Sequence, residues 1–118
     1  MLQMPNKMIL DFGAFELHAE LFELPVCEAI INILPATVDL TAWGGELYGT
    51  LELADVKKGK LADKIPAGGI AYSYRGAYLC IFFGQTPAWP VEHIGNIEGN
   101  EWERLKDARV DKVTIKIV

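Results

Sequence analysis

The residues best suited to bind a ligand are aromatic, and the first pair flanks a predicted turn. Trp43 and Tyr48 lie on either side of Gly44-Gly45, and both alternate with threonines on one face of a predicted hairpin. An aromatic pair on a face that does not fill the core is typical of a binding surface. The alternative is that the proline-bracketed loop 85–90 packs over the pair as a satellite cluster.

A second hairpin, formed by residues 69–74 and 77–84, is apolar on both faces. Two adjacent strands of this kind cannot both lie on a sheet with one wet side, so one face fills a core and the other is covered or lines a groove. Tyr78, Cys80 and Phe82 share one face of the second strand, which we predict to be the groove floor. The inward and outward faces are interchangeable at this stage.

The two histidines offer weaker candidates. His93 lies in a predicted strand and is expected to reach the same groove, with a structural or solvated histidine as the alternative. His18 alternates with Glu16 and Glu20, which could hold a metal ion, but no further ligand supports this set and we predict no metal site. No glycine-rich phosphate loop and no Ser-His-Asp or Cys-His set is evident, so we expect no cofactor and no covalent catalysis.

Composition restricts the class of partner. The chain has 118 residues, 51% of them hydrophobic, and fits one domain over residues 8–118 after a flexible segment 1–7. Its net charge of −5 argues against nucleic acid as a partner, and the lysines of residues 57–64 are expected to form a solvated loop.

The cysteines and the apolar segments bear on location. Cys27 and Cys80 lie in apolar runs without metal-ligand spacing, which predicts buried free thiols in a reducing compartment. No signal pattern is present, and no apolar stretch approaches the ~20 residues of a membrane span. We therefore expect a cytoplasmic protein that does not contact membranes.

The pattern of elements predicts a mainly β protein. Strand alternation and turns indicate hairpins over residues 8–22, 37–53 and 69–84, a strand over 91–97 and a closing strand over 112–118. Pro25 opens a short apolar helix, and Asn100 with Glu103 is expected to cap a second one. The turn of the second hairpin places Ala42 opposite Leu47, both on the core side. Seven or eight strands and two short helices predict a small closed antiparallel barrel.

These landmarks resemble the small cyclophilin-like family of bacteria and archaea. The resemblance covers most of residues 8–118 in consistent order. The matching segments are Leu24-Pro25 to Leu34-Pro35, Trp43-Gly44-x-Glu46-x-Tyr48, Gly69-Ile70-Ala71-Tyr72, Leu79-Cys80-Ile81-Phe82-Phe83-Gly84-x-Thr86-Pro87 and Ile94-Gly95-Asn96-Ile97. The resemblance implies an eight-stranded cyclophilin-type barrel with a helix at each end.

Larger cyclophilins are peptidyl-prolyl isomerases, and their chemistry needs a guanidinium near the prolyl nitrogen and an apolar pocket on the outer face. Phe82-Phe83 match their paired phenylalanines, one of which lines the proline pocket. The hairpin that corresponds to their catalytic region, residues 41–53, contains no Arg, His or Gln. Of the chain's three arginines, Arg75, Arg104 and Arg109, only Arg75 in the predicted turn is retained, as a weak catalytic candidate.

Three functions remain open. The leading hypothesis is a module that binds a short peptide, with or without proline, or a small ligand in an outer-face groove. The residues expected to line this groove are Trp43, Tyr48, Tyr78, Phe82 and His93. The alternatives are a weak peptidyl-prolyl isomerase that uses Arg75, and a structural domain whose aromatic face forms a homo-oligomer interface.

Overall fold

The computed structural model describes residues 6–118, which form nine strands, one α-helix and one 3₁₀ helix. In chain order they are β1 (Lys7–Asp11), β2 (Glu16–Leu21), α1 (Pro25–Ile31), β3 (Ala36–Asp39), β4 (Thr41–Trp43), β5 (Glu46–Thr50), β6 (Gly69–Ser73), β7 (Tyr78–Phe82), β8 (Glu92–Ile97), η1 (Glu101–Lys106) and β9 (Lys112–Ile117). The flexible segment that we predicted falls largely on residues 1–5, which lie outside this range, and Lys7 is the first residue of β1.

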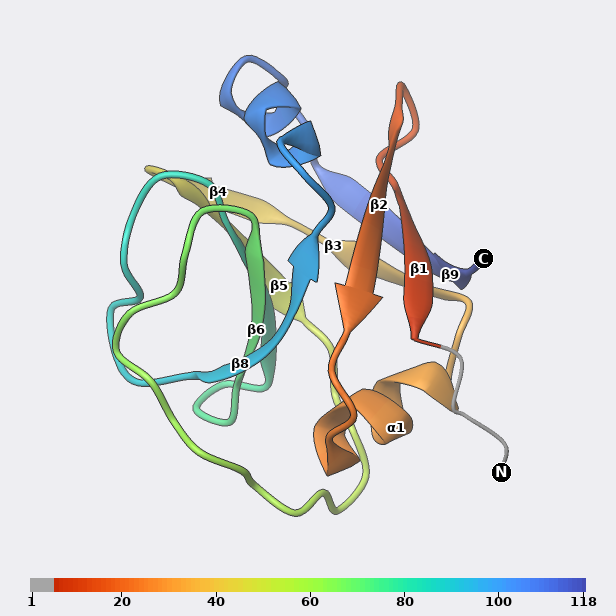
Figure 1. The fold of residues 1–118 in the computed structure, drawn as a ribbon, viewed down its shortest axis with the longest axis vertical. Helices are drawn as coiled ribbons and strands as arrows, with labels where there is room; N and C mark the ends of the chain where they lie inside the picture. Colours follow the sequence, from red (N-terminus) through yellow and green to blue (C-terminus); the bar gives the residue numbers. More distant parts are fainter. Residues whose placement is uncertain (1–5) are drawn as a thin grey trace.

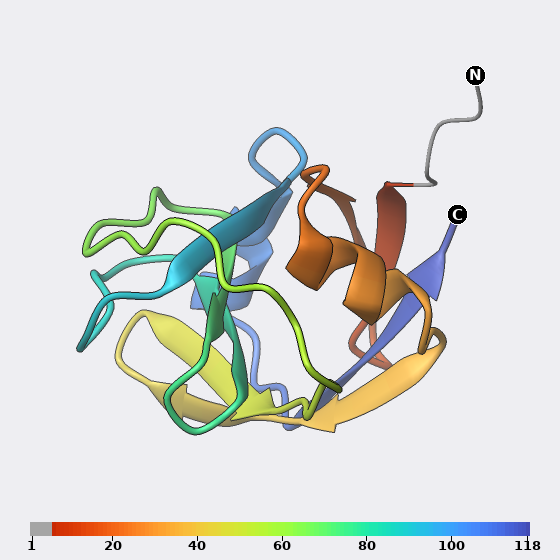
Figure 2. The same cartoon turned by 90° about the horizontal axis from the view of Figure 1, so that it is seen from below.

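All strands join one antiparallel sheet, in the order β3-β9-β1-β2-β8-β6-β7-β5-β4. The two ends of this order, β3 and β4, are consecutive in the chain and are separated only by Leu40, whose N–H donates to the Asp111 carbonyl at 2.8 Å. The sheet therefore curls into a nearly closed barrel (Figures 1 and 2), which confirms the predicted fold class. The predicted strand over residues 37–43 is divided in two because β3 pairs with β9 whereas β4 pairs with β5.

The interior of the barrel is filled with side chains. In β2, Leu17, Ala19 and Leu21 are buried, and the residues that alternate with them are exposed, as the period of two predicts. The interior leaves a void of only about 10 Å³, which is too small for a ligand. A binding site therefore has to lie outside the barrel.

The two helices lie at opposite ends of the barrel (Figure 1). Pro25 occupies the first turn of α1, and the helix buries Val26, Cys27 and Ile30 against the interior. The predicted capping of η1 is wrong: Asn100 precedes the helix but makes no side-chain hydrogen bond to it, because its backbone is not extended (φ −108°, ψ 18°).

Two further predictions have definite outcomes. Ala42 does pair with Leu47, but it is exposed rather than buried, because β4 is the last strand of the sheet and nothing covers that side. Cys27 and Cys80 are buried free thiols, as predicted. In the part of the chain that the structure describes, no helix is long and apolar enough to cross a membrane.

Candidate functional site

The outer face of β5, β6 and β7 carries a second hydrophobic cluster, separate from the barrel interior. Its buried members are Ile65, Ala71, Cys80, Phe82 and Val91. Residues of opposite parity on the same strands, such as Ile70 and Ile81, point into the interior. The predicted hairpin of residues 69–84 is thus buried on both faces, and its outer face is covered by the loop 83–91 and by part of the connection 54–68.

A cavity of about 250 Å³ opens between this outer face and the loop. Ten residues line it: Trp43, Glu46, Tyr48, Ser73, Tyr78, Cys80, Pro87, Ala88, Trp89 and Val91. Three of the aromatic residues that we expected in the groove, Trp43, Tyr48 and Tyr78, are therefore brought together on one wall. The loop 85–90, which we considered as a cover for the aromatic pair, instead forms the opposite wall.

Trp89 is held in a fixed position by its neighbours. Its indole Nε1–H donates to the Ser73 hydroxyl at 2.8 Å, and that hydroxyl donates to the Arg75 carbonyl at 2.6 Å. The Arg75 guanidinium stacks on the indole ring, 4.4 Å from its centroid. Arg75 is therefore next to the cavity wall, although it is not itself a lining residue.

The other aromatic wall is formed by strand residues. Tyr48 in β5 and Tyr78 in β7 make an edge-to-face contact, with ring centroids 5.3 Å apart and planes at 70°. Trp43 lies at the mouth of the cavity, where 53% of its surface is exposed. The cavity is thus rigid at its floor and open to solvent at one edge.

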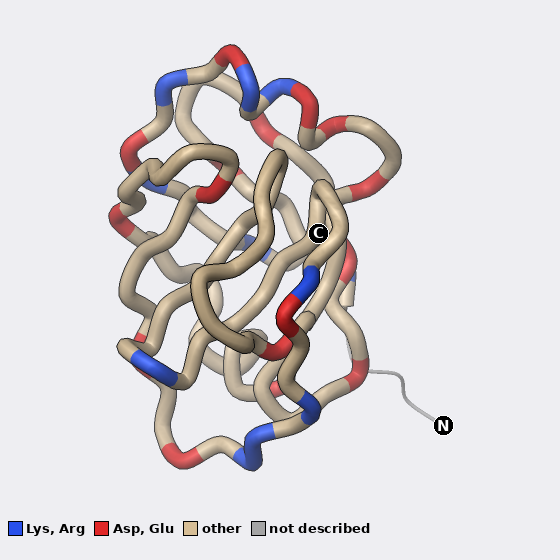
Figure 3. Tube along the Cα trace, turned by 90° about the vertical axis from the view of Figure 1, so that its left-hand side faces the viewer, with Lys and Arg blue, Asp and Glu red and all other residues tan. Residues whose placement is uncertain are grey.

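The loop 83–91 is tied to the turn of the neighbouring hairpin. Gly45 N–H donates to the Gln85 side-chain oxygen at 2.7 Å, and its carbonyl accepts from Phe83 N–H at 2.8 Å. A Cβ at residue 45 would lie 2.5 Å from Gly84 Cα, so this approach needs glycine. The loop carries no charged residue, and it lies on the side of the barrel that faces the viewer in Figure 3. The cavity is therefore covered by an uncharged segment in a fixed position.

Glu46 is the one acidic residue of the lining. It is only 7% exposed, and burial raises the pKa of its carboxyl, while hydrogen bonding from the Cys80 thiol works in the opposite direction. None of the ion pairs found in residues 6–118 includes Glu46. No fully buried side-chain oxygen in this range lacks a hydrogen-bond partner, so any carboxyl oxygen of Glu46 without one reaches the cavity surface.

The Cys80 thiol is not suited to act as a nucleophile. Burial, followed by the neighbouring Glu46 carboxyl, raises its pKa far above the ordinary value of 9.0. Cys27, in α1, is similar: burial, and then the charge of Glu92, raises its pKa to about 12. Both thiols are protonated near neutral pH and behave as small apolar side chains.

Two residues expected in the groove, Phe82 and His93, do not line the cavity. Phe82 has no exposed surface and lies within the second hydrophobic cluster. Tyr78 and Cys80, which precede it on the same face of β7, are the residues of this strand that line the cavity. His93 Nε2 is 3.0 Å from the Gly95 carbonyl and 2.9 Å from Asn96 Oδ1. Its ring packs edge-on against Phe22, so it is engaged elsewhere.

The lining residues that we did not select are Glu46 and four residues of the loop 83–91: Pro87, Ala88, Trp89 and Val91. Glu46 lies on the same face of the hairpin as Trp43 and Tyr48, so strand alternation was enough to predict that its side chain is near theirs. Trp89 stands between Pro87 and Pro90, and nothing local shows on which strand such a loop folds back. Their place in the site depends on contacts between segments far apart in the chain.

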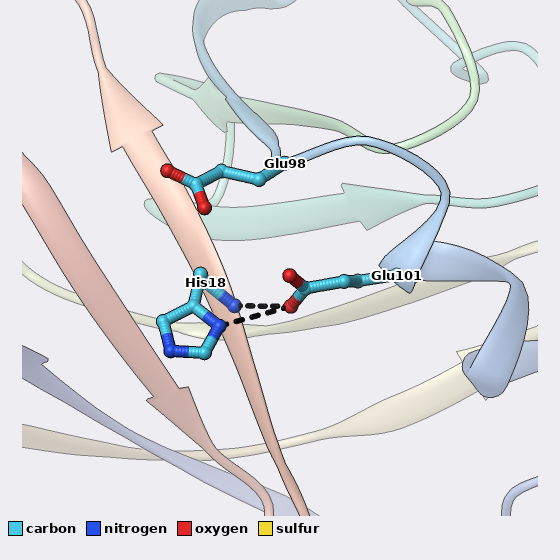
Figure 4. Close-up of side chains that lie close together, drawn as sticks. All are labelled: His18, Glu98 and Glu101. Carbon is cyan, nitrogen blue, oxygen red and sulfur yellow. Dashed lines mark hydrogen bonds and ion pairs between the residues drawn. The ribbon is translucent and has the colours of Figure 1, made fainter.

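A second group of polar side chains is formed by His18 of β2, Glu98 just after β8 and Glu101 of η1 (Figure 4). Its atoms are close enough to hold a metal ion, but internal contacts account for them. Glu101 Oε1 accepts from the His18 backbone N–H at 2.8 Å and lies 3.2 Å from its Nδ1, and Lys7 Nζ is 3.6 Å from Glu98. These contacts attach η1 to β2 and place a cation beside Glu98.

The fold and the outer-face cavity define a class of barrel, and comparison with known families identifies it. A model of the family described as "Cyclophilin-like" matches residues 6–116. The chain therefore belongs to the cyclophilin-like family, as its motifs indicated.

Solved structures agree with this assignment. A hypothetical protein from Archaeoglobus fulgidus, solved in solution, is similar with a TM-score of 0.77 and 28% identity, over 97% of this chain and 95% of that one. McbB, solved in complex with tryptophan, has the same fold at a TM-score of 0.73 and 14% identity. The match covers 94% of this chain but only 44% of McbB. No curated protein matches the sequence.

Proposed function

We propose that this protein is a binding module that holds one small apolar group in the outer-face cavity. The observation that supports the proposal is the cavity itself, about 250 Å³ in volume and lined by four aromatic side chains outside a filled barrel. Concave, largely apolar sites with a few polar groups are the usual form of ligand pockets. The hydrogen bonds from Trp89 to Ser73 and from Gly45 to Gln85 hold the cavity walls in place before a ligand binds. Binding therefore costs little entropy for ordering side chains and the loop.

The volume favours a small molecule over an extended peptide. Pockets for drug-sized ligands are typically about 300–1,000 Å³, so this cavity suits a compound of one or two rings. A peptide would place a single side chain, such as a proline ring, in the same space. The tryptophan bound by McbB makes this amino acid a reasonable first compound to test, together with simple aromatic amines and alcohols.

The chain contains three tryptophans, which provide an internal control for the experiment. Trp43 and Trp89 line the cavity, whereas Trp102 lies in η1 under Lys106. In NMR titrations of labelled protein, a ligand in the cavity shifts the indole N–H signals of Trp43 and Trp89 and leaves that of Trp102 unchanged. Sedimentation at several concentrations shows in parallel whether the exposed face of Trp43 instead forms a subunit contact.

The proposal is wrong if no compound of a broad panel moves the two cavity signals, or if all three indoles shift together. Tyr78→Ala provides the matched test of the site, because it removes one wall without touching the barrel interior. We expect it to weaken binding about tenfold while the unfolding transition remains cooperative.

A second candidate, a weak peptidyl-prolyl isomerase, is supported by the position of Arg75. Its guanidinium lies 4.4 Å from the ring of Trp89, at the edge of a cavity that is large enough for a proline ring. Exchange NMR on Ala-Xaa-Pro-Phe peptides tests this directly. Cis–trans exchange that appears only with protein and disappears in Arg75→Ala supports the isomerase, whereas shifts without exchange support the binding module.

A further inference from the structure

We propose that the ligand of the outer-face cavity is a small organic ammonium ion, whose positive charge binds beside Glu46 while its apolar part contacts the aromatic walls. This inference rests on the proposed binding function and adds the chemical class of the ligand. It follows from three features of the cavity: a buried acid without a cation, the aromatic residues around it, and the absence of positive charge from the lining.

The first feature is the environment of Glu46. Glu46 is only 7% exposed as a residue, and a carboxyl group in such a position is costly to ionise unless a cation or several hydrogen-bond donors compensate for the lost water. In residues 6–118 its polar neighbour is the Cys80 thiol, a weak donor, and it takes part in no ion pair. The cavity therefore presents an acid whose charge a bound cation would complement.

The position of Glu46 in the sheet explains why it faces the cavity. Glu46 is the first residue of β5 and pairs with Trp43 on one side and with Phe82 on the other. The alternation of β5 sends Leu47 into the barrel interior and Tyr48 to the same outer face as Glu46. Glu46 is only 7% exposed, and its neighbour Gly45 is joined to the loop 83–91 by two hydrogen bonds.

The second feature is the set of aromatic residues. Trp43, Tyr48, Tyr78 and Trp89 line the same cavity as the acid. The face of an aromatic ring carries negative potential, so several rings around one carboxyl stabilise an ammonium group and accept its methylene or ring carbons. Trp89 already binds a cation in this manner, since the Arg75 guanidinium lies over its ring.

The third feature is the distribution of positive charge. No lysine or arginine is among the lining residues, and the covering loop 83–91 is uncharged (Figure 3). Arg75 is engaged with Trp89 and lines no part of the cavity. The net charge of −5 further favours the approach of small cations.

A pair of compounds with the same skeleton tests the inference. 2-Phenylethylamine is an ammonium ion at neutral pH, and 2-phenylethanol replaces the ammonium by a neutral hydroxyl of similar size. We expect the amine to bind the wild-type protein at least about tenfold more tightly, measured from the Trp43 and Trp89 indole signals. Glu46→Gln should reduce this preference to about threefold or less.

Glu52→Gln is the matched control, because it removes the same charge from an exposed position just after β5. It should leave the amine preference unchanged. An equal loss of preference in both variants would overturn the inference, since the effect would then come from the overall charge.

The outcomes separate this inference from the proposed function. If amine and alcohol bind the wild-type protein equally, the ammonium inference is wrong and the binding function stands. If neither compound binds, the inference is also wrong, and the wider ligand panel decides the function. The wild-type comparison needs no variant, so it remains decisive even if Glu46→Gln does not fold.

Discussion

Glu46 and Glu92 are both buried carboxyl groups, but their surroundings differ. Glu92 is 2% exposed at the end of the barrel, where it accepts hydrogen bonds from the Tyr74 hydroxyl and the Gly59 backbone N–H. Glu46 is 7% exposed on the outer face, and within residues 6–118 the Cys80 thiol is the hydrogen-bond partner of its carboxyl group. One acid is satisfied by its own chain, and the other is left facing a cavity.

This difference gives Glu92 a structural role and agrees with the ligand-binding role that we propose for Glu46. By accepting from Gly59, Glu92 fixes the long connection 54–68 against β8. Burial raises the pKa of Tyr74, and the hydrogen bond to Glu92 raises it further. Nothing comparable is gained at Glu46, where the Cys80 thiol, a weak donor, offsets only part of the cost of burying a carboxyl group. Proteins tolerate such costs mainly at sites where a ligand supplies the missing partner.

The largest effect is expected for Glu92→Ala. The substitution leaves the Tyr74 hydroxyl and the Gly59 N–H without their acceptor, and each such loss costs about 1–3 kcal/mol when the group stays buried. Because Gly59 is exposed and can bind water, we expect the free energy of unfolding to fall by about 2–3 kcal/mol in urea denaturation.

Two further measurements check this prediction. The pKa of Tyr74 should fall back toward its ordinary value of 10.0 in Glu92→Ala, which an ultraviolet titration detects. Tyr74→Phe should cost less than Glu92→Ala, because it removes only one of the two contacts. A variant Glu92→Ala as stable as the wild type would mean that the two acids do not differ in this way.

Glu46→Gln should change stability in the opposite direction. Because the folded-state pKa of Glu46 is raised above its ordinary value of 4.5, its protonated form stabilises the fold at low pH. This contribution is fully present below pH 4.5 and is lost as the pH rises through the raised pKa. At neutral pH, Glu46→Gln should therefore be more stable than the wild type by about 1–2 kcal/mol, since the amide carries no charge.

The measurement for Glu46 is urea denaturation of both proteins from about pH 4 to pH 8. The stability gain of Glu46→Gln should appear only as the pH increases. Glu52→Gln, an exposed carboxyl, should show no such trend. A constant difference across this range would contradict the proposed cause, the burial of an ionisable group.

A smaller effect is expected for Ser73→Ala, next to the same cavity. The substitution removes the acceptor of the Trp89 indole N–H and the donor to the Arg75 carbonyl. We expect a loss of about 1 kcal/mol in the free energy of unfolding. In a Trp89→Phe background, which has no indole N–H, the same substitution should cost less, and a double-mutant cycle measures the difference. Equal costs in both backgrounds would show that Ser73 does not position Trp89.

The sequence predicts the barrel well because the barrel depends on local patterns. Alternation in β2, Pro25 at the start of α1 and the pairing of Ala42 with Leu47 follow from periods and turn lengths. The cavity is only half predictable. Trp43, Tyr48 and Tyr78 share a face by alternation, but the cavity also needs residues of the loop 83–91, which fold back from a distant part of the chain.

The same argument explains why Glu46 was not selected and why Phe82 and His93 do not line the cavity. A charged residue on an outer face is expected to contact water, so local rules pass over Glu46. Phe82 lies on the predicted face but is buried beneath the cavity floor. Strand alternation predicts the face of a residue, but it does not predict whether other side chains cover it. His93 is held by Asn96, three residues later on the same strand, in a region where the pairing of β8 with β6 is irregular.

The smallest effect is expected for Lys58→Gln, which tests what satisfies Glu92. Lys58 Nζ lies 5.3 Å from the centroid of the Tyr74 ring, and the hydroxyl of this tyrosine donates to Glu92. An exposed cation–π contact contributes about 0.5 kcal/mol, so the unfolding free energy should change by no more than that. Lys57→Gln, with the same loss of charge next to it, is the control. A loss above about 1 kcal/mol for Lys58→Gln alone would show that attraction to a cation, rather than the donors Tyr74 and Gly59, stabilises Glu92. The two acids would then differ in whether a cation lies nearby, and not in their hydrogen-bond donors.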